Sequence, residues 1–379
     1  MKAAVLNAFG APLAIETLPG PVLGTGEVIV DVAAAGVAGY AGDVFSGARN
    51  YMLELPVVPG AGGIGRVRAT GPDATKLGAG DWVFCDPTVR ARDDAVHPDV
   101  ILQGWTAVNE AGLKLHRFYH HGSFAEQMLV PTENVTRIGD IDAADAGRWC
   151  ALSSLLVPYG GLRAADLRAG ETLVVNGATG GFGSAGVAVA LAMGAGRVVA
   201  TGRNGRALDD LVRRFGARVR PAQMTGIEAD DRRNIVTLAG GPIDCVLDLL
   251  PREAAASQVL AAVLAVRPGG RVVLMGGVGR QKGSGASAAM AADLALPYPW
   301  LMRNDITVRG KYMYPRDAIG RMVRLVRAGL IDLAQFELTE FALDDANDAV
   351  AHAAATAGPL RLTVLRPDRR GRDGEEIRA

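Results

Sequence analysis

The stretch Leu173-Val174-Val175-Asn176-Gly177-Ala178-Thr179-Gly180-Gly181-Phe182-Gly183 decides the fold of this chain. Its apolar first half predicts a buried strand, and the small and apolar residues that continue to Met193 predict a helix directly after the glycines. Glycines let such a turn approach a pyrophosphate closely, and the helix N-terminus offers free N–H groups and a partial positive charge. The spacing is G-x-x-G-G-x-G rather than G-x-G-x-x-G, so a turn that only closes an α/β unit is the alternative. The predicted cofactor-binding residues here are Gly177, Ala178, Thr179, Gly180, Gly181, Phe182 and Gly183.

The next apolar run, at residues 198–201, supplies independent support for a dinucleotide site. It ends in Gly202-Arg203-Asn204, about 20 residues beyond the glycine turn, where NAD-binding proteins carry an acidic residue for the ribose 2′-hydroxyl. Gly202 leaves room for a 2′-phosphate, and the Arg203 guanidinium offers it several donors. Gly202, Arg203 and Asn204 therefore predict NADPH as the cofactor, although Arg203 could also be an ordinary solvated arginine.

Strand and helix patterns alternate around this motif. Further apolar runs follow at 245–249 and 271–275, and Leu208, Leu211, Val212 and Phe215 give one apolar helical face after the second strand. Such βα alternation predicts a doubly wound parallel sheet with helices on both faces. The first 150 residues instead read as β-rich, and 360–365 predicts a last strand.

Composition excludes several classes of function. Forty Lys and Arg balance forty Asp and Glu over 379 residues, so no global charge indicates nucleic acid or an anionic membrane as a partner. No apolar run reaches the roughly 18–20 residues of a membrane helix, and the N-terminus lacks a signal-peptide pattern. The three cysteines lie far apart. These features predict a cytoplasmic protein with a small-molecule substrate, and the charged tail at 368–379 is expected to be disordered.

Several ordered motifs resemble the medium-chain dehydrogenase/reductase superfamily, which includes zinc alcohol dehydrogenases and quinone oxidoreductases. The motifs are Gly26-Glu27-Val28, Ala35-Gly36-Val37, Pro56-Val57-Val58-Pro59-Gly60, Gly80-Asp81-Trp82-Val83, Gly122-Ser123-Phe124-Ala125-Glu126, the glycine turn and Pro268-Gly269-Gly270-Arg271-Val272-Val273. The resemblance implies a GroES-like catalytic domain at 1–155, completed by 312–366, and a Rossmann domain at 156–311. It also implies a nicotinamide-contacting turn at Gly276, Gly277 and Val278, and a homodimer that pairs through 306–310.

The chain departs from the zinc members of this family at the ligand positions. Ala38 replaces the first cysteine, Gly60-Ala61-Gly62 replaces Gly-His-Glu, and the third ligand falls on or near Ser153. Alanine has no donor atom, serine is a poor zinc ligand, and none of the five histidines falls on a ligand position. The sequence therefore predicts that no metal is bound.

Without zinc, a hydrogen-bond donor must stabilise the oxygen that becomes negative during hydride transfer. Tyr40 and Asp43 are the candidate catalytic residues, because they fall at or near the family's proton-relay positions; packing of Tyr40 and helix capping by Asp43 are the alternatives. The candidate substrate-binding residues are Trp105, His121, Ser153 and Trp300, of which Trp300 is better explained by packing or a dimer contact.

Three functions stay open at this point. The leading one is an NADPH-dependent, zinc-free reductase of a carbonyl or a conjugated enone or quinone. The second is a zinc-independent alcohol dehydrogenase. The third belongs to another class, a non-catalytic NADPH-binding sensor or structural protein.

Overall fold

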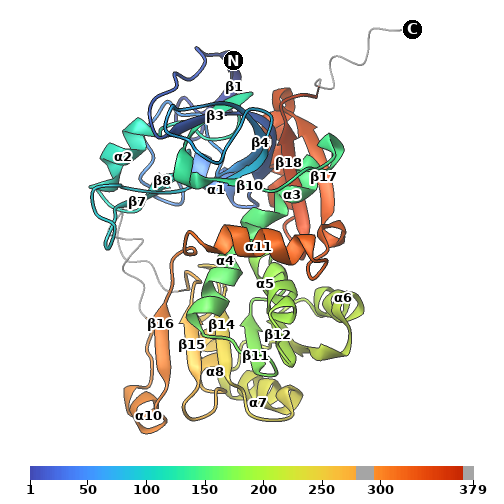
Figure 1. The fold of residues 1–379 in the computed structure, drawn as a ribbon. Coiled ribbons are helices and arrows are strands. Elements are labelled where there is room, and N and C mark those ends of the chain that lie inside the picture. Colours follow the sequence, from blue (N-terminus) through green and yellow to red (C-terminus); the bar gives the residue numbers. More distant parts are fainter. Residues whose placement is uncertain (279–293, 370–379) are drawn as a thin grey trace. The chain divides into compact units, whose positions relative to one another are not determined.

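The computed structural model describes residues 1–278 and 294–369, which form two compact units (Figure 1). Unit 1 contains Met1–Ser153, Phe336–Ala357 and the chain from Leu362 onward, and unit 2 contains Ser154–Gln335 and Gly358–Arg361. The chain thus leaves unit 1 after its N-terminal part, forms unit 2, and returns. Residues 312–335, which the family resemblance assigns to the catalytic domain, lie in unit 2.

Unit 1 is built on a seven-stranded sheet in the order β10-β5-β4-β3-β18-β17, with β9 also paired to β3. The long central strand β3 has a largely buried pattern because it has neighbours along both edges, and its bulges at Ile29/Val30 and Val32/Ala34 interrupt the pairing with β4. The strands are β3 (Glu27–Val37), β4 (Gly63–Thr70), β5 (Trp82–Cys85), β9 (Gln127–Pro131), β10 (Val135–Arg137), β17 (Glu337–Ala342) and β18 (Arg361–Arg366).

Smaller elements complete unit 1. A hairpin of β1 and β2 and a three-stranded sheet of β6, β7 and β8 accompany the large sheet. Their bounds are β1 (Lys2–Val5), β2 (Ala14–Thr17), β6 (Thr88–Arg90), β7 (Val100–Leu102) and β8 (Thr106–Ala107), and the helices are α1 (Ala41–Phe45), α2 (Gly112–Phe118), α3 (Ala146–Trp149) and α12 (Ala346–Ala355). Helix α4 (Ala151–Ala164) begins in unit 1 and continues into unit 2.

Unit 2 carries a six-stranded, wholly parallel sheet in the order β13-β12-β11-β14-β15-β16. The predicted doubly wound sheet is therefore confirmed, and Figure 1 shows β11, β14 and β15 side by side in it. The strands are β11 (Thr172–Asn176), β12 (Arg197–Gly202), β13 (Val219–Gln223), β14 (Cys245–Asp248), β15 (Arg271–Leu274) and β16 (Thr307–Gly310), and the helices are α5 (Gly181–Ala192), α6 (Gly205–Phe215), α7 (Glu228–Ala239), α8 (Ala256–Val263), α10 (Tyr298–Arg303) and α11 (Ala318–Arg327).

Helix α6 shows how local sequence places these elements. Its start is capped by Asn204, whose side-chain oxygen accepts a hydrogen bond from the Ala207 N–H at 3.2 Å. Its apolar face buries Leu208 and Leu211, as the 3.6-residue period predicts. Because Asn204 caps α6, the loop after β12 is short and consists of Arg203 and Asn204.

The described residues end before most of the predicted tail. Residues 370–379 of the segment expected to be disordered lie outside them. Among the residues that are described, none of the helices has the length and apolar character needed to cross a membrane.

Candidate cofactor and active site

The glycine turn joins β11 to α5 in unit 2. Gly177 has a φ of +86°, a conformation that a residue with a Cβ rarely adopts, and Gly183 lies so close that a Cβ there would be 2.0 Å from the Gly177 carbonyl oxygen. Gly180 precedes α5 in an extended conformation, and no side chain caps the first N–H groups of this 12-residue helix. Gly177, Ala178, Thr179, Gly180, Gly181, Phe182 and Gly183 thus form a glycine-lined turn with uncapped donors, which fits a pyrophosphate.

The end of β12 lies next to this turn. Thr201 accepts a hydrogen bond from the Gly177 N–H at 3.2 Å through its hydroxyl, and its carbonyl accepts one from the Ala178 N–H at 2.8 Å. Gly202 is buried beneath the Thr179 side chain, whereas Arg203 and Asn204 are exposed. The Asn204 side chain is engaged as the α6 cap, whereas the Arg203 side chain is exposed at this strand end.

The predicted nicotinamide-contacting turn follows β15. Gly276 cannot carry a side chain without displacement, because a Cβ there would be 2.5 Å from the Leu250 carbonyl oxygen and 2.6 Å from Asp248 Oδ2. The Gly277 N–H donates to that same Leu250 carbonyl at 3.2 Å. Val278 packs against the core of unit 2. The turn after β15 is therefore held directly against the turn after β14.

Tyr40 lies in unit 1 at the start of α1. Its ring meets the Trp105 ring edge-on at 5.9 Å, and the Arg49 guanidinium carbon lies 4.3 Å from the Tyr40 ring centroid. Burial raises the pKa of the Tyr40 phenol, Tyr51 adds to the increase, and Arg49 and the Trp105 indole N–H oppose it. The phenol therefore stays protonated at neutral pH and is available as a hydrogen-bond donor.

Trp105 and Asp43 differ sharply in exposure. Trp105 is only 2% exposed, and its indole N–H makes no hydrogen bond of good geometry within residues 1–278 and 294–369, although it lies near enough to affect the pKa of Tyr40. The Asp43 side chain is 58% exposed, and its carboxylate lies 3.7 Å from the Arg49 guanidinium. Asp43 is a solvated partner of Arg49 in this arrangement.

Comparison with known proteins gives the family. The family model described as the alcohol dehydrogenase GroES-like domain matches residues 24–140, and the model described as zinc-binding dehydrogenase matches residues 181–328. Alcohol dehydrogenase notN of Aspergillus sp. (strain MF297-2) is 30% identical over 249 residues, which cover 64% of this chain and 68% of that protein. The chain belongs to the medium-chain dehydrogenase/reductase superfamily.

Two further proteins illustrate the range of similarity. The alcohol dehydrogenase of Moraxella sp. (strain TAE123) is 32% identical over 195 residues, and the match spans about half of each protein, 51% of this chain and 56% of that one. A structure described as a zinc-binding dehydrogenase from Sinorhizobium meliloti 1021 bound to NADP superposes with a TM-score of 0.74 at 18% identity, covering 97% of this chain and 99% of that one. The protein is an alcohol dehydrogenase-like oxidoreductase, and its GroES-like and Rossmann domains are confirmed.

The zinc chemistry of this superfamily does not fit the residues present. Ala38 and Ala61 carry no donor atom, and the Ser153 hydroxyl is a poor zinc ligand. Within the described ranges, His, Cys, Asp and Glu side chains form no group of three or more that could hold a metal ion. We therefore derive no catalytic step through zinc.

The remaining predicted substrate residues occupy three different settings. His121 Nδ1 accepts a hydrogen bond from the Val58 N–H at 3.1 Å, so Nε2 carries the proton of the neutral ring, and partial burial lowers the pKa of His121. Ser153 is half-buried in α4 and is the last residue of unit 1 before the chain enters unit 2. Trp300, in α10, packs against the core of unit 2. His121 can therefore donate a hydrogen bond, whereas Trp300 is a packing residue.

Sequence reasoning missed a buried polar group at the strand ends of the Rossmann domain. Asn176 ends β11 and is 0% exposed, and Asp248 ends β14 and is 3% exposed. Asn176 Nδ2 donates to Asp248 Oδ1 at 2.8 Å. Burial raises the pKa of Asp248 to about 7, and the hydrogen bonds from Asn176 and from the Leu250 N–H limit the increase. The available signal was a polar residue directly after each of two short apolar runs, at 173–175 and 245–247.

Proposed function

We propose that this oxidoreductase is a zinc-independent, NADPH-dependent reductase that delivers hydride to a carbonyl or to a conjugated enone or quinone. The observation that carries the proposal is the Tyr40 phenol, a partly buried donor at the position of the family's relay hydroxyl, in a chain whose ligand positions hold Ala38 and Ala61. A donor that stays protonated can do part of what a Lewis acid does, because it stabilises negative charge on the substrate oxygen.

The chain's own residues account for the chemistry in this proposal. When bound, the nicotinamide supplies the hydride. The Tyr40 phenol donates a hydrogen bond to the oxygen that becomes negative, and its raised pKa favours a shared proton over a free phenolate. Where the product is an alkoxide, a stronger base than phenolate, the proton passes to that oxygen and Tyr40 is reprotonated from solvent. Trp105 and His121 shape the substrate side in this proposal, with Asp43 and Ser153 as further candidates.

NADPH is the proposed cofactor because of the end of β12. Gly202 presents no carboxylate to a 2′-phosphate, and Arg203 and Arg206 are exposed cations within the same loop and helix start. The NADP bound to the Sinorhizobium meliloti neighbour supports this choice. The glycine turn would hold the pyrophosphate through its N–H groups, and Gly276, Gly277 and Val278 would lie against the nicotinamide.

A zinc-independent alcohol dehydrogenase is the second candidate, and the names of the relatives favour it. Both candidates use the same hydride step and differ in the position of the oxygen relative to the carbon that accepts hydride. A non-catalytic NADPH-binding protein is the candidate from a different class. Steady-state assays of the purified protein, with NADPH for enones, quinones and ketones and with NADP+ for alcohols, separate the three. Reduction of enones, quinones or ketones with little oxidation of alcohols supports the reductase. Efficient oxidation of alcohols, with no turnover of enones or quinones, supports the dehydrogenase, and cofactor binding without turnover supports the third.

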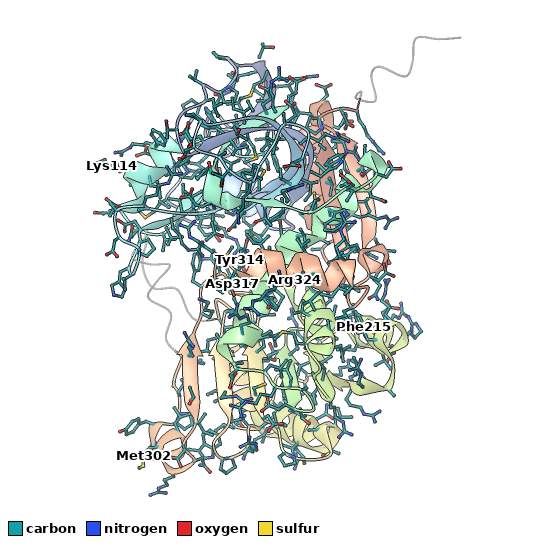
Figure 2. The ribbon with its side chains drawn as sticks, in the orientation of Figure 1. Lys114, Phe215, Met302, Tyr314, Asp317 and Arg324 are labelled. Carbon is teal, nitrogen blue, oxygen red and sulfur yellow. The ribbon has the colours of Figure 1, made fainter. Side chains whose placement is uncertain are left out.

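A homodimer is the proposed assembly, formed through the edge of the parallel sheet. Strand β16 ends the strand order of that sheet, and three of its four residues are exposed. Tyr298 and Met302 on the neighbouring helix α10 are 74% and 58% exposed, and Figure 2 shows Met302 on the outer side of this helix. An exposed edge beside large apolar side chains is a surface that a second copy can cover. Sedimentation of the wild type and of Val308→Pro, compared under the same conditions, tests whether this edge forms the dimer.

We also propose a cytoplasmic location, on the composition of the chain.

A further inference from the structure

A chain of buried hydrogen bonds runs across the ends of three neighbouring strands in unit 2. It starts at the pyrophosphate turn, where the Gly177 N–H donates to Thr201 Oγ1 at 3.2 Å. The Thr201 hydroxyl donates to Asn176 Oδ1 at 2.7 Å, and Asn176 Nδ2 donates to Asp248 Oδ1 at 2.8 Å. The chain therefore reaches from the end of β12 through β11 to the end of β14.

The far end of this chain supports the predicted nicotinamide turn. Asp248 Oδ2 lies where it would be 2.6 Å from a Cβ at Gly276, and the Asp248 carboxyl also accepts from the Leu250 N–H. The Leu250 carbonyl in turn accepts from the Gly277 N–H at 3.2 Å. Asp248 thus contacts the segment that holds Gly276 and Gly277, and hydrogen bonds through Asn176 and Thr201 connect it to the glycine turn.

Burial makes the links of this chain depend on one another. Thr201 and Asn176 are 0% exposed, and Asp248 is 3% exposed, so water cannot replace a lost partner easily. The Thr201 hydroxyl can donate only once, and its donation to Asn176 orients the lone pair that the Gly177 N–H uses. The Asn176 amide is fixed in orientation because its nitrogen must face Asp248. A change at either end therefore disturbs the other end.

We propose that Asp248 and Thr201 are positioning residues that couple the pyrophosphate turn to the nicotinamide turn, so that binding at one turn orders the other. This inference rests on the proposed dinucleotide site. In this proposal the buried hydrogen bonds of unit 2 align the pyrophosphate and nicotinamide ends of the cofactor. A misplacement of about 1 Å at a reacting centre costs about a hundredfold in rate, so alignment of this kind bears on turnover as well as on affinity.

The test uses a ligand that lacks nicotinamide. 2′-Phospho-ADP-ribose carries the adenosine, the pyrophosphate and the second ribose of NADPH, and it lacks the nicotinamide ring that would lie against Gly276. Binding of this fragment and of NADPH is measured by calorimetry for wild type, Asp248→Asn, Thr201→Val and the double variant, together with kcat at saturating NADPH. Thr201→Ser keeps the hydroxyl and serves as the rescue, and Thr237→Val removes a threonine hydroxyl on the outer face of α7 as the matched control.

Coupling has a specific signature in these measurements. Asp248→Asn should weaken fragment binding about 3- to 10-fold, because the carboxyl that lies against Gly276 also accepts from Asn176, the residue before the glycine turn. Thr201→Val should lower kcat as well as affinity. The double variant should lose less than the product of the two single losses, Thr201→Ser should recover most of the wild-type values, and Thr237→Val should keep them.

Other outcomes overturn the proposal. Unchanged fragment affinity in Asp248→Asn, or fully multiplicative losses in the double variant, would show that the two turns act independently. If Thr201→Val does not fold, the fragment measurement on Asp248→Asn decides alone. Failure of the proposed cofactor site is distinct, because the wild type would then bind neither NADPH nor the fragment. A preference for NADH would appear as tight binding of plain ADP-ribose, with which the same comparison is repeated.

Discussion

The side chain of Thr179 lies directly over Gly202: a Cβ added at Gly202 would be 2.4 Å from Thr179 Cγ2 and 2.8 Å from its Oγ1. Thr179, a residue of the glycine turn, therefore limits the size of the side chain at position 202, the position expected to contact the ribose 2′ group. An acidic side chain at 202 needs both the right chemistry and the removal of this obstacle.

Cofactor preference should consequently invert in two steps. Gly202→Asp alone should weaken both NADPH and NADH, because Thr179 must move. Adding Thr179→Ala removes the two nearest atoms and should restore NADH binding while the carboxylate repels the 2′-phosphate. The change in preference should be about 10- to 150-fold, the size of a charge-assisted hydrogen bond. Fluorescence titration of both cofactors measures it, and a double variant that still prefers NADPH would show that the end of β12 does not read the ribose.

Replacement of Arg203 should show how much of the NADPH affinity comes from charge at the 2′-phosphate rather than from contacts that NADPH and NADH share. Arg203→Ala should weaken NADPH about tenfold and change NADH less than twofold, because only NADPH carries the 2′-phosphate. Arg213→Ala is the matched control, since Arg213 is an exposed arginine of α6, the helix that follows Arg203, and pairs with Asp210. The NADPH advantage of the wild type should also shrink as salt rises. Equal losses of the two cofactors in Arg203→Ala would speak against this role.

The Tyr40 hydroxyl should matter for turnover and little for cofactor binding. Tyr40→Phe removes the donor and keeps the ring that packs on Trp105 and Arg49, so kcat should fall about 10²–10⁴-fold with NADPH affinity nearly unchanged. Tyr298→Phe, at an exposed tyrosine of α10, is the control. A loss of turnover below threefold would return Tyr40 to a packing role and leave Asp43 as the next candidate.

Asp248 should make folding stability depend on pH in a defined direction. Its pKa is raised by burial to about 7 in the folded protein, so the stability that the protonated form contributes is complete below pH 4 and is lost as the pH rises to about 7. Relative to Asp248→Asn, the wild type should lose stability across this window, by up to about 4 kcal/mol. Chemical unfolding at pH 4.5, 6 and 8 measures the difference. Thr237→Val should follow the wild-type profile, and a constant difference between wild type and Asp248→Asn would rule out the titration.

The fold could be predicted where one continuous stretch of sequence carries the pattern of several consecutive elements. The segment from Thr172 to Asn204 carries a strand, a glycine turn, a helix and the next strand in one continuous stretch, and the structure has all four. The Asp248–Asn176–Thr201 chain could not be predicted in this way. Its members lie 72 and 25 residues apart, and only the strand order brings them together.

The exposure and the steric contacts of individual side chains could not be predicted from sequence patterns either. Asp43 has the spacing of a relay residue, but its exposure depends on how α1 packs. The steric limit at Gly202 depends on where the Thr179 side chain points, which spacing along the chain does not encode. The assignment of 312–335 to the catalytic domain came from the family resemblance, whereas α11 joins unit 2 through contacts such as the ion pair of Arg163 with Asp317, a residue labelled in Figure 2.

The central claim is that a chain matched by a zinc-binding dehydrogenase model works without zinc. Elemental analysis of the purified protein, combined with reductase assays before and after exhaustive treatment with a strong chelator, tests it most directly. With Ala38 and Ala61 at the ligand positions, we expect far less than one zinc per chain and full activity after chelation. About one zinc per chain, with activity that is lost on chelation and restored by added zinc, would contradict the account.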